Sequence, residues 1–305
     1  MAHITFFVPA FNCARTLRET VASIFSGNLR EGDELVIVDD ASTDGTSDLI
    51  RQLQQEYSSI RAIAHRHNRG GGAARNTAVE NATHEYLFCL DSDNILAPSS
   101  VPKLREFLAE TGADVAAFQC LHYFVDNASA VTHRWIFKPG RTSLADFLAG
   151  TVVPGASGNY LFTRESWVRA RGYPEFAGAL DAWGFGLREV GTEQKMMVMP
   201  DSHYHHRHGH ESYWVREARR GKTSLIALQL LIPFLEQLEI RDVNYIMSPK
   251  GRLTWFERLD QRPLRLKSGQ LGKSGTVEGL APQSTSRPGL ARRLLRLLGR
   301  RLGIR

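Results

Sequence analysis

The stretch Tyr86-Leu87-Phe88-Cys89-Leu90-Asp91-Ser92-Asp93 decides the fold class of this chain. Its first five residues form an uninterrupted apolar run, which is typical of a strand buried on both faces of a parallel sheet. Asp91 and Asp93 therefore stand at the carboxyl end of a strand, where open α/β sheets bind ligands. Two carboxylates one residue apart suit a hard divalent cation that carries a diphosphate. The pattern alone is weak, because carboxylates at such positions also cap helices.

Two further strand, loop and helix units precede this stretch. In the first, Ile4–Val8 is an apolar run that Pro9 is expected to stop, and residues 14–25 then follow helical spacing. In the second, Leu35–Val38 runs into Asp39–Thr46, a loop of acids, hydroxyls and glycine before another helix. A capping loop needs one acid, and this loop begins with two. We expect these carboxylates to accept hydrogen bonds from a base N–H or from ribose hydroxyls.

A third strand, Ile60–Ala64, ends in the glycine-rich segment His65–Asn76. Three consecutive glycines allow the backbone to approach a ligand closely, and the helix that follows directs its N–H groups and positive dipole end toward a bound anion. The segment matches neither a Walker loop nor the G-x-G-x-x-G pattern. As the third polar loop in a series of strand ends, it predicts a cradle for nucleotide phosphates, with Arg75 as charge partner.

Together these segments resemble the family-2 glycosyltransferases, which are inverting, nucleotide-sugar-dependent enzymes of GT-A fold. The resemblance rests on four motifs in the family's order and spacing, namely Val8–Asn12, Val38–Thr46, Asn68–Asn76 and Leu90–Asp93. Weaker similarity extends to about Trp214. The resemblance implies an α/β fold with a Rossmann-like mixed sheet flanked by helices, to which this chain adds helices at its C-terminal side.

The family's site residues carry over onto matching positions of this chain. By the resemblance, the nucleotide-sugar would be bound by Pro9, Phe11, Asn12, Asp39, Asp40, Asn68, Gly71, Arg75, Asp91 and Ser92. Asp91 and Asp93 would also hold Mn²⁺ or Mg²⁺ with the donor diphosphate. Many members have a further acid where this chain has Asn94, so we expect Asp93 to provide most of the coordination.

A later segment is similar to the family's acceptor region, where a Glu-Asp pair at the head of a helix provides the general base. Leu180 replaces the Glu here, and Asp181 aligns with the Asp that is expected to deprotonate the acceptor hydroxyl. Trp183 and Phe185 are expected to raise the pKa of Asp181 and to offer a face for sugar stacking. The alternative is that Asp181 only caps the helix that begins near Ala182.

Five of the eleven histidines crowd into His203–His210. A closed zinc site usually takes its ligands from two separated pairs, and no cysteine lies nearby, which argues against zinc. One interpretation is a polar loop whose histidines form local hydrogen bonds. The other comes from the resemblance, because a late histidine in GT-A enzymes often completes the metal shell or contacts the diphosphate. His208 is the first candidate for that role and His210 the second.

Cysteine content and hydropathy bear on the compartment. Cys13, Cys89 and Cys120 are few, odd in number and unpatterned, which fits a reducing cytoplasm. We recognise no signal peptide and no apolar run of membrane-spanning length, because Leu225–Leu235 is too short and is expected to form a buried or docking helix. The expected location is therefore the cytoplasm, at the inner face of the membrane if the C-terminal segment binds lipid.

Positive charge is concentrated in the C-terminal segment. Residues 263–305 contain ten Lys or Arg and one acid, although the whole chain has a formal net charge of only +6. Residues 263–289 are expected to be a flexible linker, and residues 290–305 a short basic helix with six leucines, which predicts an element that seeks anionic lipid. Nucleic acid is excluded as partner because leucines have no role on a phosphate backbone. Packing on the protein's own core or on a second subunit stays open.

The sequence as a whole predicts a GT-A domain at residues 1–215, with a nucleotide-sugar half at 1–98 and an acceptor half at 99–215, followed by a helical extension at 216–262. The predicted reaction moves a sugar from a nucleoside diphosphate-sugar, with UDP-sugars favoured, to a hydroxyl of a glycan or lipid-linked acceptor. We expect a role in cell-surface polysaccharide or glycan assembly. The alternatives are a catalytically inactive nucleotide-sugar-binding or scaffolding protein, a nucleotidyltransferase of related fold, and a zinc protein.

Overall fold

The structure is a computed structural model that describes residues 2–150, 153–154, 158–209 and 221–268. Its internal contacts divide the chain into a unit at residues 1–267 and a second at 268–305, and the description concerns the first. The predicted basic helix at 290–305, most of the predicted linker and His210 lie outside the described residues.

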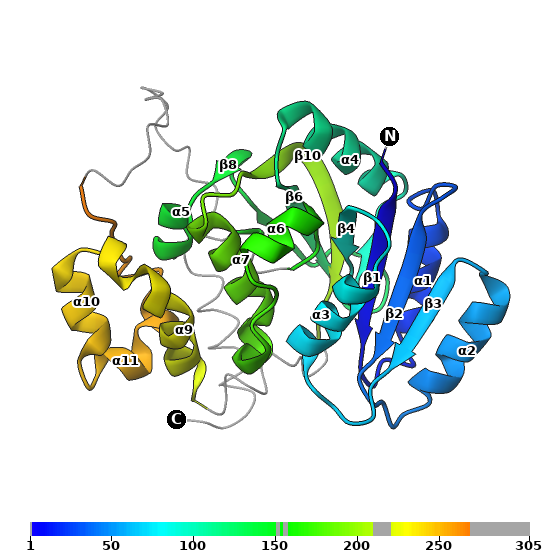
Figure 1. Ribbon diagram of the computed structural model, residues 1–305, viewed down its shortest axis with the longest axis horizontal. Helices are drawn as coiled ribbons and strands as arrows, with labels where there is room; N and C mark the ends of the chain where they lie inside the picture. The colour runs from blue at the N-terminus through cyan, green and yellow to red at the C-terminus, as the bar shows by residue number, and fades with distance from the viewer. Residues whose placement is uncertain (1, 151–152, 155–157, 210–220, 269–305) are drawn as a thin grey trace. The chain divides into compact units, whose positions relative to one another are not determined.

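A mixed sheet forms the centre of the unit, and its order among the described residues is β3-β2-β1-β4-β9-β6-β10-β5, with β7 beside β6 and β8 beside β10 (Figure 1). Pairs β2–β3, β1–β2, β1–β4 and β6–β10 are parallel, whereas β9 pairs antiparallel with both β4 and β6. The strands are β1 Ile4–Ala10, β2 Glu34–Asp39, β3 Ile60–Ala64, β4 Tyr86–Cys89, β5 Ile95–Leu96, β6 Val115–Phe124, β7 His133–Ile136, β8 Gly140–Thr142, β9 Tyr160–Thr163 and β10 Met196–Arg207. The predicted α/β class and mixed sheet are confirmed.

Helices alternate with the strands along the N-terminal half, as the spacing of apolar residues predicts. The first helix begins three residues later than expected, because residues 13–16 form a turn in which the N–H of Thr16 donates to the carbonyl of Cys13. The helices are α1 Leu17–Phe25, α2 Thr46–Glu56, α3 Gly71–Asn81, α4 Ser100–Thr111, α5 Leu144–Leu148, α6 Arg164–Arg169, η2 Glu175–Leu180, α7 Asp181–Gly191, α9 Thr223–Leu231, η3 Ile232–Gln237, α10 Ile240–Met247, α11 Gly251–Thr254 and η4 Phe256–Arg258.

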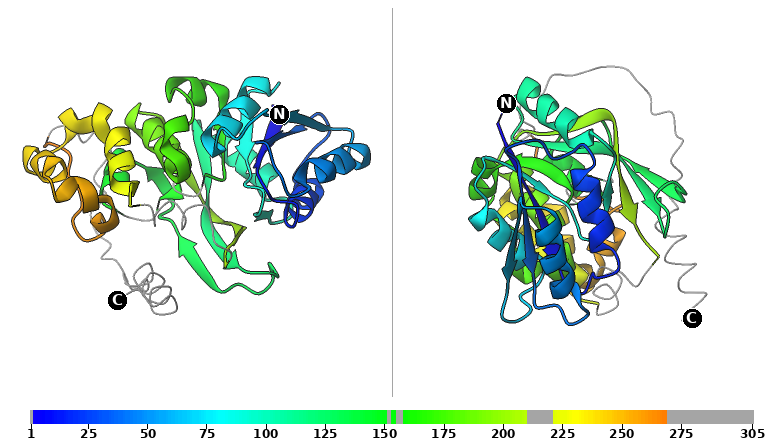
Figure 2. Two further views of the ribbon diagram at one scale, coloured as in Figure 1. Left: turned by 90° about the horizontal axis from the view of Figure 1, so that it is seen from below. Right: turned by 90° about the vertical axis from the view of Figure 1, so that its right-hand side faces the viewer.

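The sheet buries two separate apolar layers, one on each face. Helices cover both faces of the sheet (Figures 1 and 2). Successive residues of a strand point to opposite faces, so in β1 the side chain of Phe7 enters one layer and that of Phe6 the other. Helices α1, α2 and α4 contribute to the layer around Phe6. Helices α3, α5, α7 and α9 contribute to the layer around Phe7. Strands buried on both faces explain why β1, β2 and β4 appear in the sequence as continuous apolar runs.

Pro9 does not end the first strand, which continues through it to Ala10. Phe7 accepts a hydrogen bond from the N–H of Leu90, so Phe7 and, two residues on, Pro9 direct their backbone groups toward β4. Strand β4 ends at Cys89. The ladder therefore has no partner opposite Pro9 on that side, and the missing N–H costs no hydrogen bond.

The helical extension after β10 is part of the same core rather than a separate appendage. Leu230, Leu231 and Trp255 are at most 3% exposed and pack in the layer that contains α7. Leu264 is buried as well, and Leu266 forms a bridge with Leu238. The chain thus stays packed through the first residues of the predicted linker. Within the described residues, no helix is long and apolar enough to cross a membrane.

Most of the histidine-rich segment is strand β10 and not a polar loop. From His203 to Arg207 this strand lies parallel to β6, in register with Cys120 to Phe124. His203 and His205 flank His122 on one face, with ring centroids 4.2 and 5.7 Å from it. Alternating histidines carry only a weak apolar pattern of period two, so the sequence does not predict this strand.

Candidate active site

The Asp91-Ser92-Asp93 loop leaves β4 and is held from two sides. The hydroxyl of Thr16 donates to the carbonyl of Ser92 at 2.9 Å. From the other side, Nε of Arg207 donates to the carbonyl of Asp93 at 3.0 Å. Arg207 is 8% exposed and is itself fixed by an ion pair with Glu19. The loop backbone is therefore positioned by the protein without any ligand.

Asp91 lies between an arginine and an asparagine. Its Oδ1 is 2.6 Å from Nη2 of Arg75. Its Oδ2 accepts a hydrogen bond from the amide of Asn159 at 3.0 Å, and its N–H donates to the Oδ1 of Asn159 at 2.8 Å. One carboxylate oxygen thus faces a positive charge and the other a neutral donor, which fixes the side chain at the strand end.

Asp181 is the first residue of α7 and is 5% exposed. Its Oδ2 is 2.6 Å from Nη1 of Arg75, and its Oδ1 accepts from the N–H of Ala182 at 2.6 Å. Burial raises the pKa of this carboxyl, while the charge of Arg75 opposes that rise. Arg75 therefore bridges Asp91, at the end of β4, and Asp181, at the start of α7.

Gly71 makes room for this bridge. A Cβ atom on Gly71 would lie 2.7 Å from Nη1 of Arg75 and 2.8 Å from Oδ2 of Asp181. Both distances are shorter than real side-chain contacts, so only glycine fits without displacing the ion pair. The glycine-rich segment at the head of α3 is thus explained in part by the packing of charged side chains within the protein.

Asp93 differs from Asp91 in being open to solvent on one side. Crowding by protein atoms, followed by the like charge of Asp91, raises the pKa of Asp93 to about 7. Asp91 and Asp93 offer carboxylate oxygens, which are ligands that Mn²⁺ and Mg²⁺ prefer, and such ions often bind through one or two carboxylates plus substrate phosphates. The donor set of this chain fits that group.

Asp40 closes the loop that precedes α3. Its Oδ1 accepts from the N–H of Arg69 at 2.8 Å, and its Oδ2 accepts from the N–H of Gly70 at 2.7 Å. Nδ1 of His65 lies 2.6 Å from the same Oδ1, and the amide of Asn68 donates to the carbonyl of Asp40 at 3.2 Å. Asp40 is only 2% exposed, so its first role is to shape the glycine-rich loop.

Asp39 and Asn12 order the loop after β2. Asp39 accepts from the N–H of Ser42 at 3.0 Å and from the hydroxyl of Ser47. Asn12 has a φ of +49° and accepts from the N–H of Thr43 at 2.7 Å. Asn tolerates this left-handed backbone better than most residues, because its short polar side chain bonds locally. These contacts join the ends of β1 and β2 into one rim.

The other predicted donor contacts differ in exposure. Phe11 is 43% exposed and offers a free aromatic face beside the rim. Pro9 is buried within β1, Asn68 is exposed, and Ser92 is partly buried. The structure thus places the predicted nucleotide residues at the carboxyl ends of β1, β2 and β4, in the loop after β3 and in α3, with Phe11 as an accessible apolar surface among them.

His208 does not contact either strand-end acid. Its Nε2 lies 2.7 Å from the hydroxyl of Thr132, and its ring packs against Tyr123 and His133. His206 is the histidine whose pKa responds to Asp91, although burial dominates and lowers that pKa to about 4. Across the parts of the chain that the structure describes, no group of three or more His, Cys, Asp or Glu side chains is arranged to hold a metal ion.

The aromatic residues after Asp181 belong to the core. Phe185 is fully buried, with its ring 4.1 Å from that of Tyr173, and Trp183 is 7% exposed and packs against Phe256. Neither offers a face for a sugar, so the predicted stacking surface is wrong. Leu180 also packs in the core, which explains why an apolar side chain stands where the family has Glu.

Three site residues were missed because their partners are distant in sequence. Asn159 meets Asp91 across 68 residues, and Arg207 meets Asp93 across 114. Asn76 lies in a motif that the sequence identified, but its contacts with Tyr173 and Trp167 were not foreseen. Asn76 joins α3 to the segment before α7, because it accepts from the N–H of Tyr173 and the indole of Trp167.

Comparison with known proteins agrees with the predicted family. Residues 5–172 match the family described as "Glycosyl transferase family 2". Similar curated proteins include the succinoglycan biosynthesis protein ExoO of Rhizobium meliloti, 34% identical over 42% of this chain and 34% of that protein. Another is the UDP-Glc:alpha-D-GlcNAc-diphosphoundecaprenol beta-1,3-glucosyltransferase WfaP of Escherichia coli, 30% identical over 43% of this chain and 50% of that protein. The chain spans 58% or less of the length of these and the other curated relatives compared.

Solved structures share the fold. TarS residues 1–349 of S. aureus, in complex with UDP-GlcNAc, superposes with a TM-score of 0.65 at 19% identity, covering 84% of this chain and 74% of that one. The mannosyltransferase PcManGT of Pyrobaculum calidifontis, in complex with GDP-Man and Mn²⁺, gives a TM-score of 0.56 at 19% identity, covering 85% and 69%. These likenesses establish the GT-A type of the sheet and its flanking helices.

Proposed function

Because this chain belongs to glycosyl transferase family 2, we propose that it transfers a sugar from a nucleoside diphosphate-sugar to an acceptor hydroxyl with inversion at the anomeric carbon. The observation that carries the proposal is the Arg75 bridge, with both ion-pair distances at 2.6 Å. It joins the acid at the end of β4 to the acid at the start of α7. A sugar donor held at Asp91 and a sugar acceptor held at Asp181 would meet beside the guanidinium of Arg75.

On the donor side, Asp93 and Asp91 hold Mn²⁺ or Mg²⁺. When bound, the cation neutralises charge that develops on the leaving diphosphate. Phe11 stacks on the base, and the rim at Asp39 and Asn12 orients the ribose. A UDP-sugar is the favoured donor, since the names of WfaP and of the TarS complex include UDP-sugars.

On the acceptor side, Asp181 is the general base. Both of its oxygens already accept one hydrogen bond in the structure, and each retains a second lone pair for the acceptor hydroxyl. Burial raises its pKa, which strengthens it as a base, while the charge of Arg75 opposes that rise. The proton moves to Asp181 as the acceptor oxygen attacks and the diphosphate departs. A single displacement of this kind inverts the anomeric carbon.

The acceptor is a glycan or a lipid-linked saccharide in cell-surface polysaccharide assembly. The support is the names of relatives, which refer to succinoglycan biosynthesis and to a diphosphoundecaprenol acceptor. The proposed location is the cytoplasm, and the three unpaired cysteines fit its reducing conditions.

The test measures sugar transfer by Asp181→Asn with a UDP-sugar and Mn²⁺. The release of UDP gives the rate, and NMR gives the anomeric configuration of the product. The variant should retain its donor KM and lose about 10²- to 10⁴-fold in kcat, the usual worth of a positioned general base. Asp48→Asn, at an exposed position of α2, is the matched control and should leave both unchanged. A variant within threefold of the parent would assign the base to another residue.

A further inference from the structure

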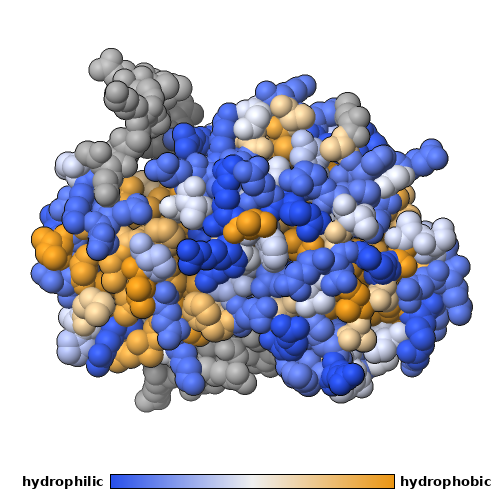
Figure 3. Space-filling view, in the orientation of Figure 1, coloured by the Kyte–Doolittle hydropathy of each residue, from blue (hydrophilic) through white to orange (hydrophobic). Residues whose placement is uncertain are grey.

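The helical extension from α9 to η4 takes no part in the proposed reaction, yet it carries an unusual surface. Nine large apolar side chains are exposed in the described chain, and five of them belong to this short extension, so apolar exposure is concentrated there. They are Leu225, Ile232, Ile240, Met247 and Leu253. Figure 3 shows hydrophobic side chains gathered over the α9, α10 and α11 region. A concentration of this kind marks a surface of interaction.

Helix α10 presents this surface most clearly. Ile240 and Met247 are seven residues apart, which places them on the same face of the helix, and they are 67% and 54% exposed. Asp242 and Ile246 lie on the other side and are fully buried. The helix therefore has one buried side, which carries both Asp242 and Ile246, and an apolar pair that faces outward. Leu253, in α11, is also 50% exposed.

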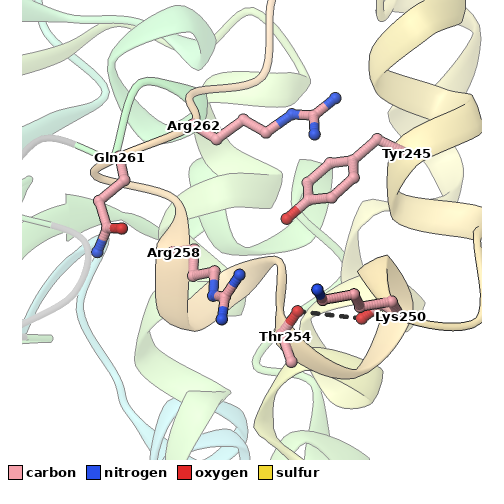
Figure 4. Close-up of a pocket in the computed structure, with 6 residues that line it drawn as sticks. All are labelled: Tyr245, Lys250, Thr254, Arg258, Gln261 and Arg262. Carbon is pink, nitrogen blue, oxygen red and sulfur yellow. Dashed lines mark hydrogen bonds between the residues drawn. The ribbon is translucent and has the colours of Figure 1, made fainter.

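A basic hollow lies between α10, α11 and η4 (Figure 4). Its volume is about 310 Å³, and it is lined by Tyr245, Lys250, Thr254, Arg258, Gln261 and Arg262. Three of these are cations and none is an acid. The guanidinium of Arg262 lies 3.5 Å from the centroid of the Tyr245 ring. Among the described residues, none of the three cations forms an ion pair with a carboxylate, so an anion from outside would meet no competing acid in the hollow.

We propose that this extension docks on a membrane surface that contains anionic phospholipid. The hollow at Lys250, Arg258 and Arg262 receives a headgroup phosphate, and Ile240, Met247 and Leu253 enter the interfacial layer. Cations alone would equally suit a soluble anion, and apolar side chains alone would suit a protein. The two together, on short helices that lie side by side, are the pattern of elements that bind at a lipid interface.

The positive charge of the hollow argues against two other binding partners, the C-terminal segment of the chain and a second copy of the chain. Residues 269–305 carry eight Lys or Arg and one acid, so this segment would be repelled by a basic hollow. A second copy packed face to face would oppose the same three cations to each other, because a two-fold interface brings identical patches together. The described extension is itself basic, with eight Lys or Arg against five acids at residues 222–268, and one of those acids, Asp242, is buried beside Arg265.

A fluorescent label distinguishes docking of the extension from attachment through any other segment. The full chain with Cys120→Ser receives an environment-sensitive dye at Leu253→Cys or, as matched control, at Val168→Cys, an apolar position of α6 that is 60% exposed. Phosphatidylcholine vesicles containing phosphatidylglycerol should shift the dye emission to the blue at position 253 and leave it unchanged at 168. Pure phosphatidylcholine vesicles and inorganic phosphate should have no effect at either position.

A charge variant tests the hollow itself. In co-sedimentation, the full chain with Lys250→Gln, Arg258→Gln and Arg262→Gln should bind anionic vesicles roughly tenfold or more weakly, since each cation near such a surface contributes substantially. The control variant removes three exposed cations elsewhere, with Arg51→Gln, Lys103→Gln and Arg141→Gln. Its affinity for anionic vesicles should fall clearly less.

Four results would overturn the proposal. The first two are equal dye responses at positions 253 and 168, and equal losses of vesicle affinity in the two charge variants. The third is a dye response at 253 to inorganic phosphate that anionic vesicles do not reproduce, and the fourth is a lipid-free dimer in ultracentrifugation that Leu253→Ser dissociates. The last result would assign the apolar face to a second copy of the chain.

Discussion

Two pairs of carboxylates line the candidate site, one at the end of β2 and the other divided between the end of β4 and the start of α7, and they are held in different ways. Asp39 and Asp40 accept hydrogen bonds mainly from backbone N–H groups of their own neighbourhood. Asp91 and Asp181 share the single guanidinium of Arg75. The first pair shapes the loops after β2 and before α3, where each carboxylate accepts more than one hydrogen bond. The second pair links the end of β4 to the start of α7 through one side chain.

This difference makes the second pair vulnerable at one point. Arg75→Met should lower the free energy of unfolding by about 3–5 kcal/mol, because it leaves a buried carboxylate without its partner. It should also abolish sugar transfer. Urea unfolding of the full chain measures the first effect. In the double variant with Asp181→Asn, part of the lost stability should return, since the uncompensated charge is gone.

Arg18→Met is the matched control for that loss. Arg18 pairs with Glu56 at 2.7 Å, but the two side chains are 49% and 44% exposed. An ion pair at such a position is worth less than about 1 kcal/mol. If the Arg18 and Arg75 variants lose equal stability, the buried Arg75 bridge has no special role in joining the end of β4 to the start of α7.

Gly71→Ala breaks the bridge without removing a charge. The added methyl group would fall within 2.8 Å of both Arg75 and Asp181 and should cost roughly 1–3 kcal/mol of stability, as overpacking does. Transfer should slow more than donor binding weakens. In an Asp181→Asn background the same substitution should reduce kcat little further, because the base it displaces is already absent. Fully additive losses in kcat would show that Gly71 acts on some other group.

A third kind of carboxylate, Glu189, forms no ion pair with any cation in the part of the chain that the structure describes. It is fully buried, and the Ser166 hydroxyl donates to it at 2.9 Å. Burial raises its pKa to about 8. The folded protein therefore keeps a proton that the unfolded chain releases above its ordinary pKa of 4.5, so stability falls as pH rises between about 4.5 and 8.

Glu189→Gln should remove this pH dependence. Relative to the variant, the parent should lose roughly 1 kcal/mol in unfolding free energy between pH 7 and pH 9. Urea unfolding at the two pH values gives the difference, and other titrating groups cancel in the comparison. A constant gap between parent and variant would mean that Glu189 is ionised in the folded protein throughout this range.

The parts that sequence predicts well are those encoded locally. Strands β1, β2 and β4 are continuous apolar runs, and each is followed at once by the polar loop that functions with it. The sequence also predicts a helix that begins near Ala182, and α7 begins at Asp181. A buried strand and its terminal loop are both visible within about ten residues.

What sequence could not supply is pairing across the fold. Arg75 was expected to face a nucleotide phosphate, and in the structure both of its terminal nitrogens contact acids. Trp183 and Phe185 were expected to face a sugar, but aromatic side chains at helical spacing fit a core equally well. The spacing of residues along a chain predicts which face of a helix or strand a residue occupies. It does not predict which distant helix or strand packs on that face.

The most direct test is calorimetric titration of UDP into the protein with and without Mn²⁺. The parent should bind UDP tightly only with the cation. Asp93→Asn, on the donor side, should lose that metal-dependent gain, whereas Asp181→Asn, on the acceptor side, should keep it. If Asp93→Asn binds UDP with Mn²⁺ as tightly as the parent does, the strand-end acids do not hold the cation and the donor diphosphate.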